Sequence, residues 1–539
     1  MPILVHLVAK SVACCIILWI FSLKASCQEP PDKFNQLTPE NVPGSIVLKG
    51  FDIVGNQILP QAEIDRLLKP YLFRPIKFSS LLRLQQEITQ LYVQQGYFTS
   101  GAYIPPQKIK DRTIRIEIIE GSISEIKIRG LKHLPQEYIR SRLAIASQPP
   151  LKQDKLLNAL QLLQLNPLIA NISAELSQGI DPGESFLEVE VEEADTFALE
   201  FSVDNYRNPS VGTFGRQGSI SENNLFGFGD RFTVAYVNTD GSDSVENLSY
   251  VIPVGAYNGE IKLFHAFSDS SIISKPFQDL NLGSKNHYYE VSYRQPLYQT
   301  FKQDFSLGLA FSRQNTQLSL MDIGFPSLAR GSDVEGRTNI STLRLFQEYS
   351  DRDLNHVLAI RSQFNIGLDA FDATINPDDI PDSRFFVWRG QAHYLKSLTP
   401  KTNLSLRTDL QLADRALVTS EQLTSGGIQS VRGYRQERIL SDNGFFFSAE
   451  LHNTLWQKSQ GNLTLKLNPF FDFAQVWNSD DLPLDINTLA SVGFGLELSI
   501  KENLTARLDW GIPLVTDNSF QGDSLQENGI YFSLQTKPY

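Results

Sequence analysis

Cysteine is almost absent from this 539-residue chain. Its three copies all lie near the N-terminus: Cys14, Cys15 and Cys27. The apolar run from Ser11 to Leu23 holds about thirteen apolar residues, fewer than the ~20 that a membrane-spanning helix needs. Lys10 before this run and small residues after it predict a secretory signal peptide over residues 1–27, cleaved before Gln28. The exported chain would then have no cysteine for a disulfide or a metal site.

Positive charge is also scarce, because the net charge is −12. A phosphate backbone binds basic surfaces, so we expect no nucleic-acid partner. The mean hydropathy of −0.19 and the lack of a second sustained apolar run exclude a bundle of membrane helices. Lipidation of Cys27 is disfavoured because Lys24 occupies a position where a lipoprotein signal has an aliphatic residue.

Motifs for catalysis and for metal binding are missing as well. The seven histidines are scattered without a His-x-x-x-His spacing, and the sequence has neither a Gly-x-Ser-x-Gly elbow nor a phosphate-binding loop. Asp-rich segments such as Asp378-Asp379 have oxygen ligands for calcium, but such runs are more often hydrated loop surface. We therefore expect no enzymatic activity, no cofactor and no metal.

What the chain does contain is a long series of alternating segments after residue 197. Phe197, Leu199, Phe201 and Val203 share one side of a strand, with polar residues between them. Comparable runs begin at Leu404, Leu463 and Val492. Because the apolar set continues for about ten residues and the polar set is charged, residues 197–539 predict a transmembrane antiparallel β-barrel of around sixteen strands. We expect four long connections that face the exterior, at 268–287, 314–338, 369–384 and 414–443. Short turns that face the periplasm are expected between the remaining strands.

Two shorter α/β units precede this segment. After a proline-rich tether at 28–45, residues 46–121 and 122–194 each predict strand, helix, helix, strand, strand. Gly96 is expected to end a helix in a left-handed conformation, and Gly121 to be the whole joint between the units. The expected helices are 60–68, 79–95, 135–143 and 153–165.

The order of these parts resembles the two-partner-secretion transporters of the haemolysin and filamentous-haemagglutinin type, in which POTRA domains precede a barrel. Four stretches carry the resemblance: Gly96-Tyr97 with Tyr103 to Gln107, Ile118 to Gly121 with Ile126 to Gly130, Pro182 to Leu187, and Asn224 to Asp230. The most specific pair is Val431-Arg432-Gly433-Tyr434, in the long connection 414–443, and Phe470-Phe471-Asp472.

In that family the first tetrapeptide lies at the tip of a loop that folds back into the pore, where its arginine meets the aspartate on the barrel wall. The residues fit this geometry, because the phase of Leu463, Leu465 and Leu467 places Phe470 and Asp472 in the lumen. The loop motif is thus Val431, Arg432, Gly433 and Tyr434. The wall partners are Phe470 and Asp472.

The resemblance implies an outer-membrane translocator that secretes a large β-helical exoprotein, with the POTRA domains in the periplasm. Its implied partners are the exoprotein, outer-membrane lipids and the barrel assembly machinery. Alternatives are an insertion factor of the same superfamily, which would carry more POTRA repeats, and a diffusion porin, which would not need them. Two features depart from the family: residues 28–45 are short for a plug helix, and Tyr539 is out of phase with Ile530, Phe532 and Leu534.

Overall fold

The computed structural model describes residues 44–538, except 322, 325–329, 378–379, 459–461, 502 and 518–522. The chain forms two compact units, which meet in sequence at Asp195 and Thr196. The expected signal peptide, nearly all of the tether, Asp378-Asp379 and Tyr539 lie outside the described residues. Within the described ranges, no helix is both long and apolar enough to cross a membrane.

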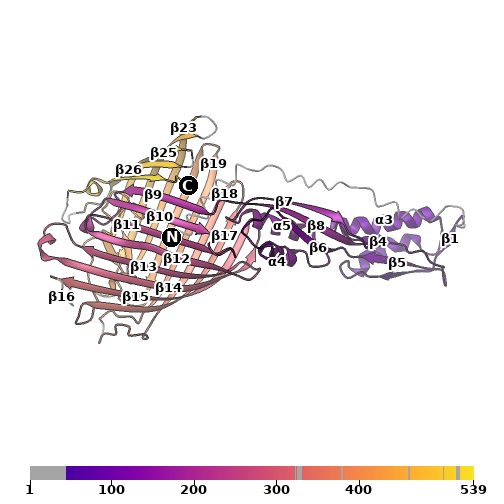
Figure 1. Cartoon of the computed structure of the whole chain (residues 1–539), viewed down its shortest axis with the longest axis horizontal. Coiled ribbons are helices and arrows are strands. Elements are labelled where there is room, and N and C mark those ends of the chain that lie inside the picture. Colours follow the sequence, from indigo (N-terminus) through magenta and orange to yellow (C-terminus); the bar gives the residue numbers. More distant parts are fainter. Residues whose placement is uncertain are drawn as a thin grey trace. The chain divides into compact units, whose positions relative to one another are not determined.

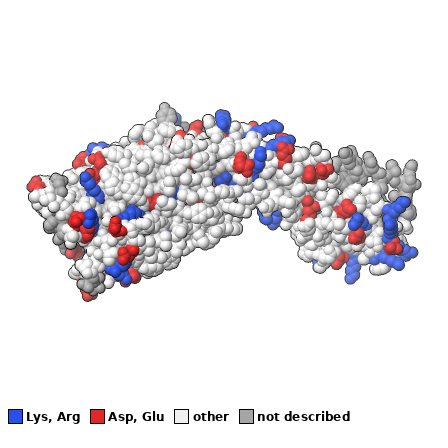
Figure 2. Space-filling view, turned by 60° about the horizontal axis from the view of Figure 1, so that its bottom comes forward, with Lys and Arg blue, Asp and Glu red and all other residues white. Residues whose placement is uncertain are grey.

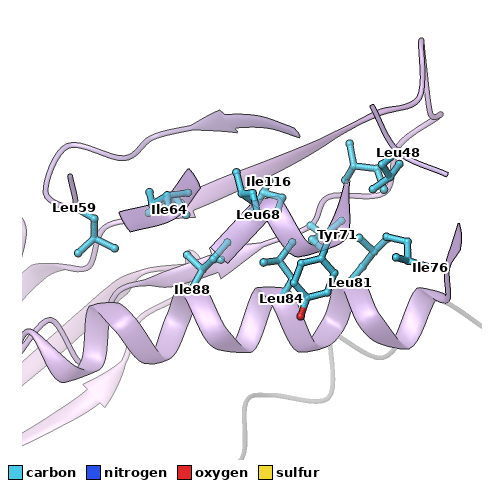
Figure 3. Close-up of a cluster of buried hydrophobic side chains, with 14 of the residues drawn as sticks. Leu48, Leu59, Ile64, Leu68, Tyr71, Ile76, Leu81, Leu84, Ile88 and Ile116 are labelled. Carbon is cyan, nitrogen blue, oxygen red and sulfur yellow. The ribbon is translucent and has the colours of Figure 1, made fainter. Parts of the chain in front are cut away.

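The first repeat packs two helices on a three-stranded sheet. Its elements are β1 (Ile46–Val47), β2 (Gly50–Val54), α2 (Gln61–Leu68), η3 (Lys69–Tyr71), β3 (Pro75–Ile76), α3 (Phe78–Gln94), β4 (Gly101–Tyr103) and β5 (Thr113–Ile119). The sheet order is β2-β5-β4, with β2 and β5 parallel. Helical spacing turns Leu81, Leu84 and Ile88 of α3 onto this sheet, where they are almost fully buried (Figure 3).

The second repeat has the same topology. Its elements are β6 (Ser122–Arg129), α4 (Gln136–Ala146), α5 (Gln153–Gln164), β7 (Ile169–Gln178) and β8 (Glu184–Glu193), with sheet order β6-β8-β7. The duplication extends to single glycines. Gly55 and Gly130 each follow the first strand at φ near +90°, and each faces a carbonyl of the last strand, at Ile118 and at Val191. The predicted internal repeat is therefore present in the structure.

The joint between the two repeats is held by several backbone contacts. Gly121 donates its N–H to Ser100 Oγ at 2.9 Å and accepts one from Leu151 at 2.8 Å. Gly96, which has the expected left-handed φ of +87°, accepts from Gln153 N at 3.0 Å. Leu151 is fully buried there. The joint is thus a packed interface, more than the single-residue hinge that the sequence indicated.

The second unit is a closed antiparallel barrel (Figure 1). In the described residues it has sixteen long strands and the two-residue β16 (Ile323–Gly324). The long strands are β9 (Phe197–Asp204), β10 (Gly215–Asn223), β11 (Arg231–Asn238), β12 (Ser242–Val254), β13 (Gly259–Ser271), β14 (Leu282–Gln299), β15 (Gln303–Leu320), β17 (Arg337–Arg352), β18 (His356–Leu368), β19 (Phe386–Thr399), β20 (Thr402–Ala413), β23 (Asn443–Lys458), β24 (Leu463–Trp477), β25 (Thr488–Ile500), β26 (Leu504–Pro513) and β27 (Ile530–Thr536). The predicted fold class is confirmed.

Side chains sort on the barrel wall as the alternation predicted. Along β25, Val492, Phe494 and Leu496 are exposed on the outside, whereas Leu489 and Ser491 are buried on the inside. Much of the middle of the wall seen in Figure 2 is free of charged residues, which gather toward the two ends of the barrel. An uncharged band around a barrel is what contact with lipid requires.

The connections differ in part from the expectation. β13 continues to Ser271 and β14 begins at Leu282, so the expected loop at 268–287 is shorter. Its polar residues belong to strands that are longer than a bilayer crossing needs. Three further long connections, 205–214, 478–487 and 514–529, join strands where short turns were expected, and that prediction was wrong. Polar strand ends and polar loops have the same composition, which is why the sequence did not separate them.

Candidate functional site: a loop docked on the inner wall

The connection between β20 and β23 folds back against the inside of the barrel. Within it, β21 (Leu423–Ser425) and β22 (Ile439–Ser441) pair as a short hairpin. The tip, Val431 to Tyr434, is buried, and Arg432 is only 1% exposed although it is a long cation. A buried charge is costly unless it is paired, so the partners of Arg432 decide whether the loop can dock.

The structure brings Arg432 and Asp472 together. Arg432 Nε lies 2.7 Å from one carboxylate oxygen of Asp472, and Nη2 lies 3.0 Å from the other. The backbone N–H of Arg432 donates to the same carboxylate at 3.2 Å. The guanidinium carbon also lies 3.3 Å from the centre of the Phe470 ring. The planar fork of arginine can make this bidentate and stacked contact, which a lysine ammonium cannot.

Two further carboxylates face Arg432, and the sequence reasoning missed both. Arg432 Nη1 lies 2.6 Å from Glu450 of β23 and 3.4 Å from Asp509 of β26. Arg507 bridges the same two carboxylates, at 2.8 Å and 2.6 Å. The alternation of side chains along each strand could have indicated both residues, because it places Glu450 and Asp509 at lumen-facing positions. The site is a network of two arginines and three carboxylates.

Glycines on the wall let the loop backbone come close. Gly433 adopts φ +96°, which an L side chain rarely adopts. It lies against Gly511 of β26, where a Cβ would stand 2.5 Å from Gly433 N and 2.7 Å from the carbonyl carbon of Arg432. A glycine inside a strand often marks such an approach, so Gly511 could have been suspected from the sequence.

Tyrosines complete the docking. Tyr434 Oη lies 3.0 Å from the carbonyl oxygen of Ala490 and 2.9 Å from that of Val515. Tyr531 Oη of β27 accepts the N–H of Gly433 at 3.1 Å and donates to the carbonyl of Tyr434. Val431 is fully buried in an apolar cluster with side chains from β23, β24 and β25. All four residues of the loop motif therefore contact the wall.

A polar cavity lies beside the docked loop. Its volume is about 320 Å³, and it separates Gln429, Gln436 and Glu437 of the loop from the inner side of β9, β10 and β12. Asn208 Nδ2 donates a hydrogen bond to the Glu437 carboxylate at 2.9 Å. The loop is thus tightly bound to the β23–β27 side and only lightly bound to the β9–β12 side. Across the described residues, no group of three or more His, Cys, Asp or Glu side chains is arranged to hold a metal.

Comparison with known proteins identifies the family. The family model of the haemolysin secretion/activation proteins ShlB/FhaC/HecB matches residues 183–498, and the model of the ShlB-type POTRA domain matches residues 46–121. The chain belongs to this family of secretion proteins. Membership places the barrel in the outer membrane and the POTRA repeats in the periplasm, and it supports a two-partner secretion transporter over the porin and the insertion factor.

Several curated relatives and solved structures are similar over most of the chain. The heme/hemopexin transporter HuxB of Haemophilus influenzae is 24% identical over 82% of this chain and 79% of its own. The outer membrane transporter CdiB of Dickeya dadantii is 24% identical over 76% and 72%. The structure of CdiB from Escherichia coli superposes with a TM-score of 0.71 at 20% identity, covering 93% of both chains, and shows the same fold.

Proposed function

We propose that this protein passes a large, unfolded exoprotein through its barrel, and that the docked loop holds the pore in a transport-competent shape. The contact of Arg432 with Asp472, Glu450 and Asp509 carries the proposal. A network of this size is costly to bury and unnecessary for a closed barrel, so it supports a role in positioning the loop. The proposal includes no catalytic step.

Recognition of the exoprotein would begin on the POTRA repeats. Each three-stranded sheet has two edge strands, β2 and β4 in the first repeat and β6 and β7 in the second. An extended segment can add to such an edge through main-chain hydrogen bonds without demanding much sequence. The periplasm has no nucleotide to drive transport, so folding of the exoprotein outside would make its return unfavourable.

The test is secretion by Arg432→Ala, Arg432→Lys and Asp472→Ala variants, measured as exoprotein in the medium at equal barrel abundance. Candidate exoproteins are co-expressed, beginning with the reading frames next to this gene. Breaking a buried pair from one side costs about 3–5 kcal/mol, so the equilibrium constant for docking of the loop should fall by about two to four orders of magnitude. We expect all three variants to lose most secretion, because lysine lacks the planar fork.

The matched control is Lys466→Ala. Lys466 pairs with Glu497 at 2.8 Å on neighbouring strands of the same wall, and within the described residues neither side chain forms a hydrogen bond or ion pair with the loop. This variant should secrete normally. Normal secretion by Arg432→Ala and Asp472→Ala would refute the role of the loop.

A further inference from the structure

One end of the first POTRA repeat exposes an aromatic side chain in an unusual backbone conformation. Phe73, between η3 and β3, is 73% exposed and has φ +57°. Its N–H donates to the carbonyl of Leu48 at 2.8 Å. A bulky residue at positive φ costs roughly 1–3 kcal/mol in conformational free energy, and burial of the Phe73 ring does not offset this cost because the ring is exposed. Strain of this kind is common where a side chain is held for a ligand.

Three cations without an ion-pair partner in the described residues lie on the segments next to Phe73, and one of them, Arg74, has its guanidinium 5.8 Å from the centre of the Tyr71 ring. Lys49 donates its N–H to the carbonyl of Arg112 at 2.9 Å, which brings these two exposed residues next to Leu48 and Phe73. Arg74 follows Phe73 and is exposed as well. Throughout the described chain, no carboxylate forms an ion pair with any of these three cations. We call Lys49, Phe73, Arg74 and Arg112 the Phe73 patch. Figure 2 shows Lys and Arg gathered at this end of the repeat, in a chain whose net charge is −12.

In the second repeat, the connection between the two helices is covered by another part of the chain. Phe73 and Arg74 of the patch lie on the connection between the two helices of the first repeat, α2 and α3. In the second repeat, the connection between α4 and α5 lies against Gly96 of the first repeat: Gln153, where the connection ends, donates its N–H to the carbonyl of Gly96 at 3.0 Å, and the Lys152 stem lies beside the same glycine. The same element is therefore an interface in one copy and an exposed, basic surface in the other.

We propose that the Phe73 patch docks an acidic segment of the exoprotein that also carries an apolar side chain. The inference rests on the proposed function, since it names a surface that recognises the exoprotein before translocation. Carboxylates of the segment would pair with Lys49, Arg74 and Arg112, and its apolar side chain would cover Phe73. Exposed charges attract over about 8 Å at physiological salt, so this contact speeds encounter and weakens as salt rises.

The test uses the full-length protein in detergent and a short fluorescein-labelled peptide of Glu, Leu and Gly, followed by fluorescence anisotropy. The variant Lys49→Glu/Arg74→Glu/Arg112→Glu should raise the Kd about tenfold or more, because three favourable pairs become repulsive. Phe73→Gly removes the ring and relieves the strain, so it should weaken binding severalfold without lowering the thermal stability. The control Lys132→Glu/Arg140→Glu/Lys155→Glu changes the charge of the second repeat equally and should bind as the wild type does.

Other occupants give different results. Equal binding of a matched peptide with Lys in place of Glu, or equal weakening by the control variant, would overturn the proposal. Preferred binding to phosphatidylglycerol vesicles would assign the patch to a membrane instead. Binding that appears only after residues 28–43 are deleted would assign it to the N-terminal segment of this chain. Because the assay does not require secretion, a failure here leaves the role of Arg432 untouched, and the reverse also holds.

Discussion

At the scale of single residues, the fit between the loop and the wall depends on the missing side chains of Gly433 and Gly511 as much as on the charge of Arg432. Arg432 contributes the cation, and its contact with Asp472 requires the loop backbone at Gly433 to lie so close to Gly511 that a Cβ on Gly511 would stand 2.5 Å from Gly433 N. The ion network and the glycine contact therefore depend on each other. Removing the ion network or adding a side chain at the glycine contact should each release the tip of the loop.

Gly511→Ala tests this dependence without using secretion. The added Cβ would stand 2.5 Å from Gly433 N, and overpacking of this kind costs about 1–3 kcal/mol. The undocked state should increase about 5- to 150-fold. Limited trypsin digestion should then cut after Arg432, which is protected in the wild type. Gly218→Ala is the control, because its Cβ would make only an ordinary 3.6 Å contact with Phe201. Equal protection of Arg432 in both variants would contradict the close-approach argument.

The sequence predicted the central pair of the site and missed its surroundings. The phase of β24 was enough to place Phe470 and Asp472 inside, because the strand period is fixed. Glu450 and Asp509 lie on strands that are distant in sequence. Their convergence depends on the register of β23, β25 and β26, which alternation alone does not set.

At the scale of elements, the two POTRA repeats share a carboxylate at the end of the last strand. Glu120 accepts the N–H of Gln57 at 2.8 Å in the first repeat. Glu193 accepts the N–H groups of Lys132, His133 and Leu134 at 2.8 to 3.0 Å in the second. Both fasten the turn that follows the first strand. Burial alone would raise the pKa of Glu193, but hydrogen bonds from Leu134, Lys132 and His133 outweigh it and lower that pKa.

This pKa shift predicts a pH-dependent contribution to stability. A lowered folded pKa means that Glu193 stabilises the turn above its unfolded pKa of about 4.3, and that the contribution is lost as the pH falls through the folded value. Glu193→Gln should cost about 1.5–3 kcal/mol at pH 7, and the cost should shrink as the pH falls below the unfolded pKa and through the lowered folded pKa. Hydrogen exchange of residues 131–134, corrected for the intrinsic rate at each pH, measures the difference. A difference that does not change with pH would contradict the assignment.

At the scale of the whole molecule, the barrel wall and the docked loop are separate sources of order. The wall is held by a closed ladder of backbone hydrogen bonds, to which the ion network of Arg432 does not belong. The number of strands followed from the length of residues 197–539 and the span of a bilayer. The lengths of individual strands did not, because several extend beyond the apolar band.

Asp472→Ala should therefore leave the barrel folded. On an unheated SDS gel it should migrate as the wild type does, since the cost of about 3–5 kcal/mol falls on the loop. Deletion of residues 530–539, which removes β27, should abolish the compact band because the ladder can no longer close. Loss of that band in Asp472→Ala would show that the loop supports the wall.

The closing seam also constrains biogenesis. β27 pairs with β9, and Asn205 beside β9 donates to the carbonyl of Ile530, 325 residues further along the chain. Contacts so distant in sequence form late, because the entropy of closing a long loop is lost before the contacts can stabilise the fold. The ring cannot shut until its final residues have crossed the inner membrane, so every newly exported copy passes through an open sheet with two bare edges that must be shielded from its neighbours.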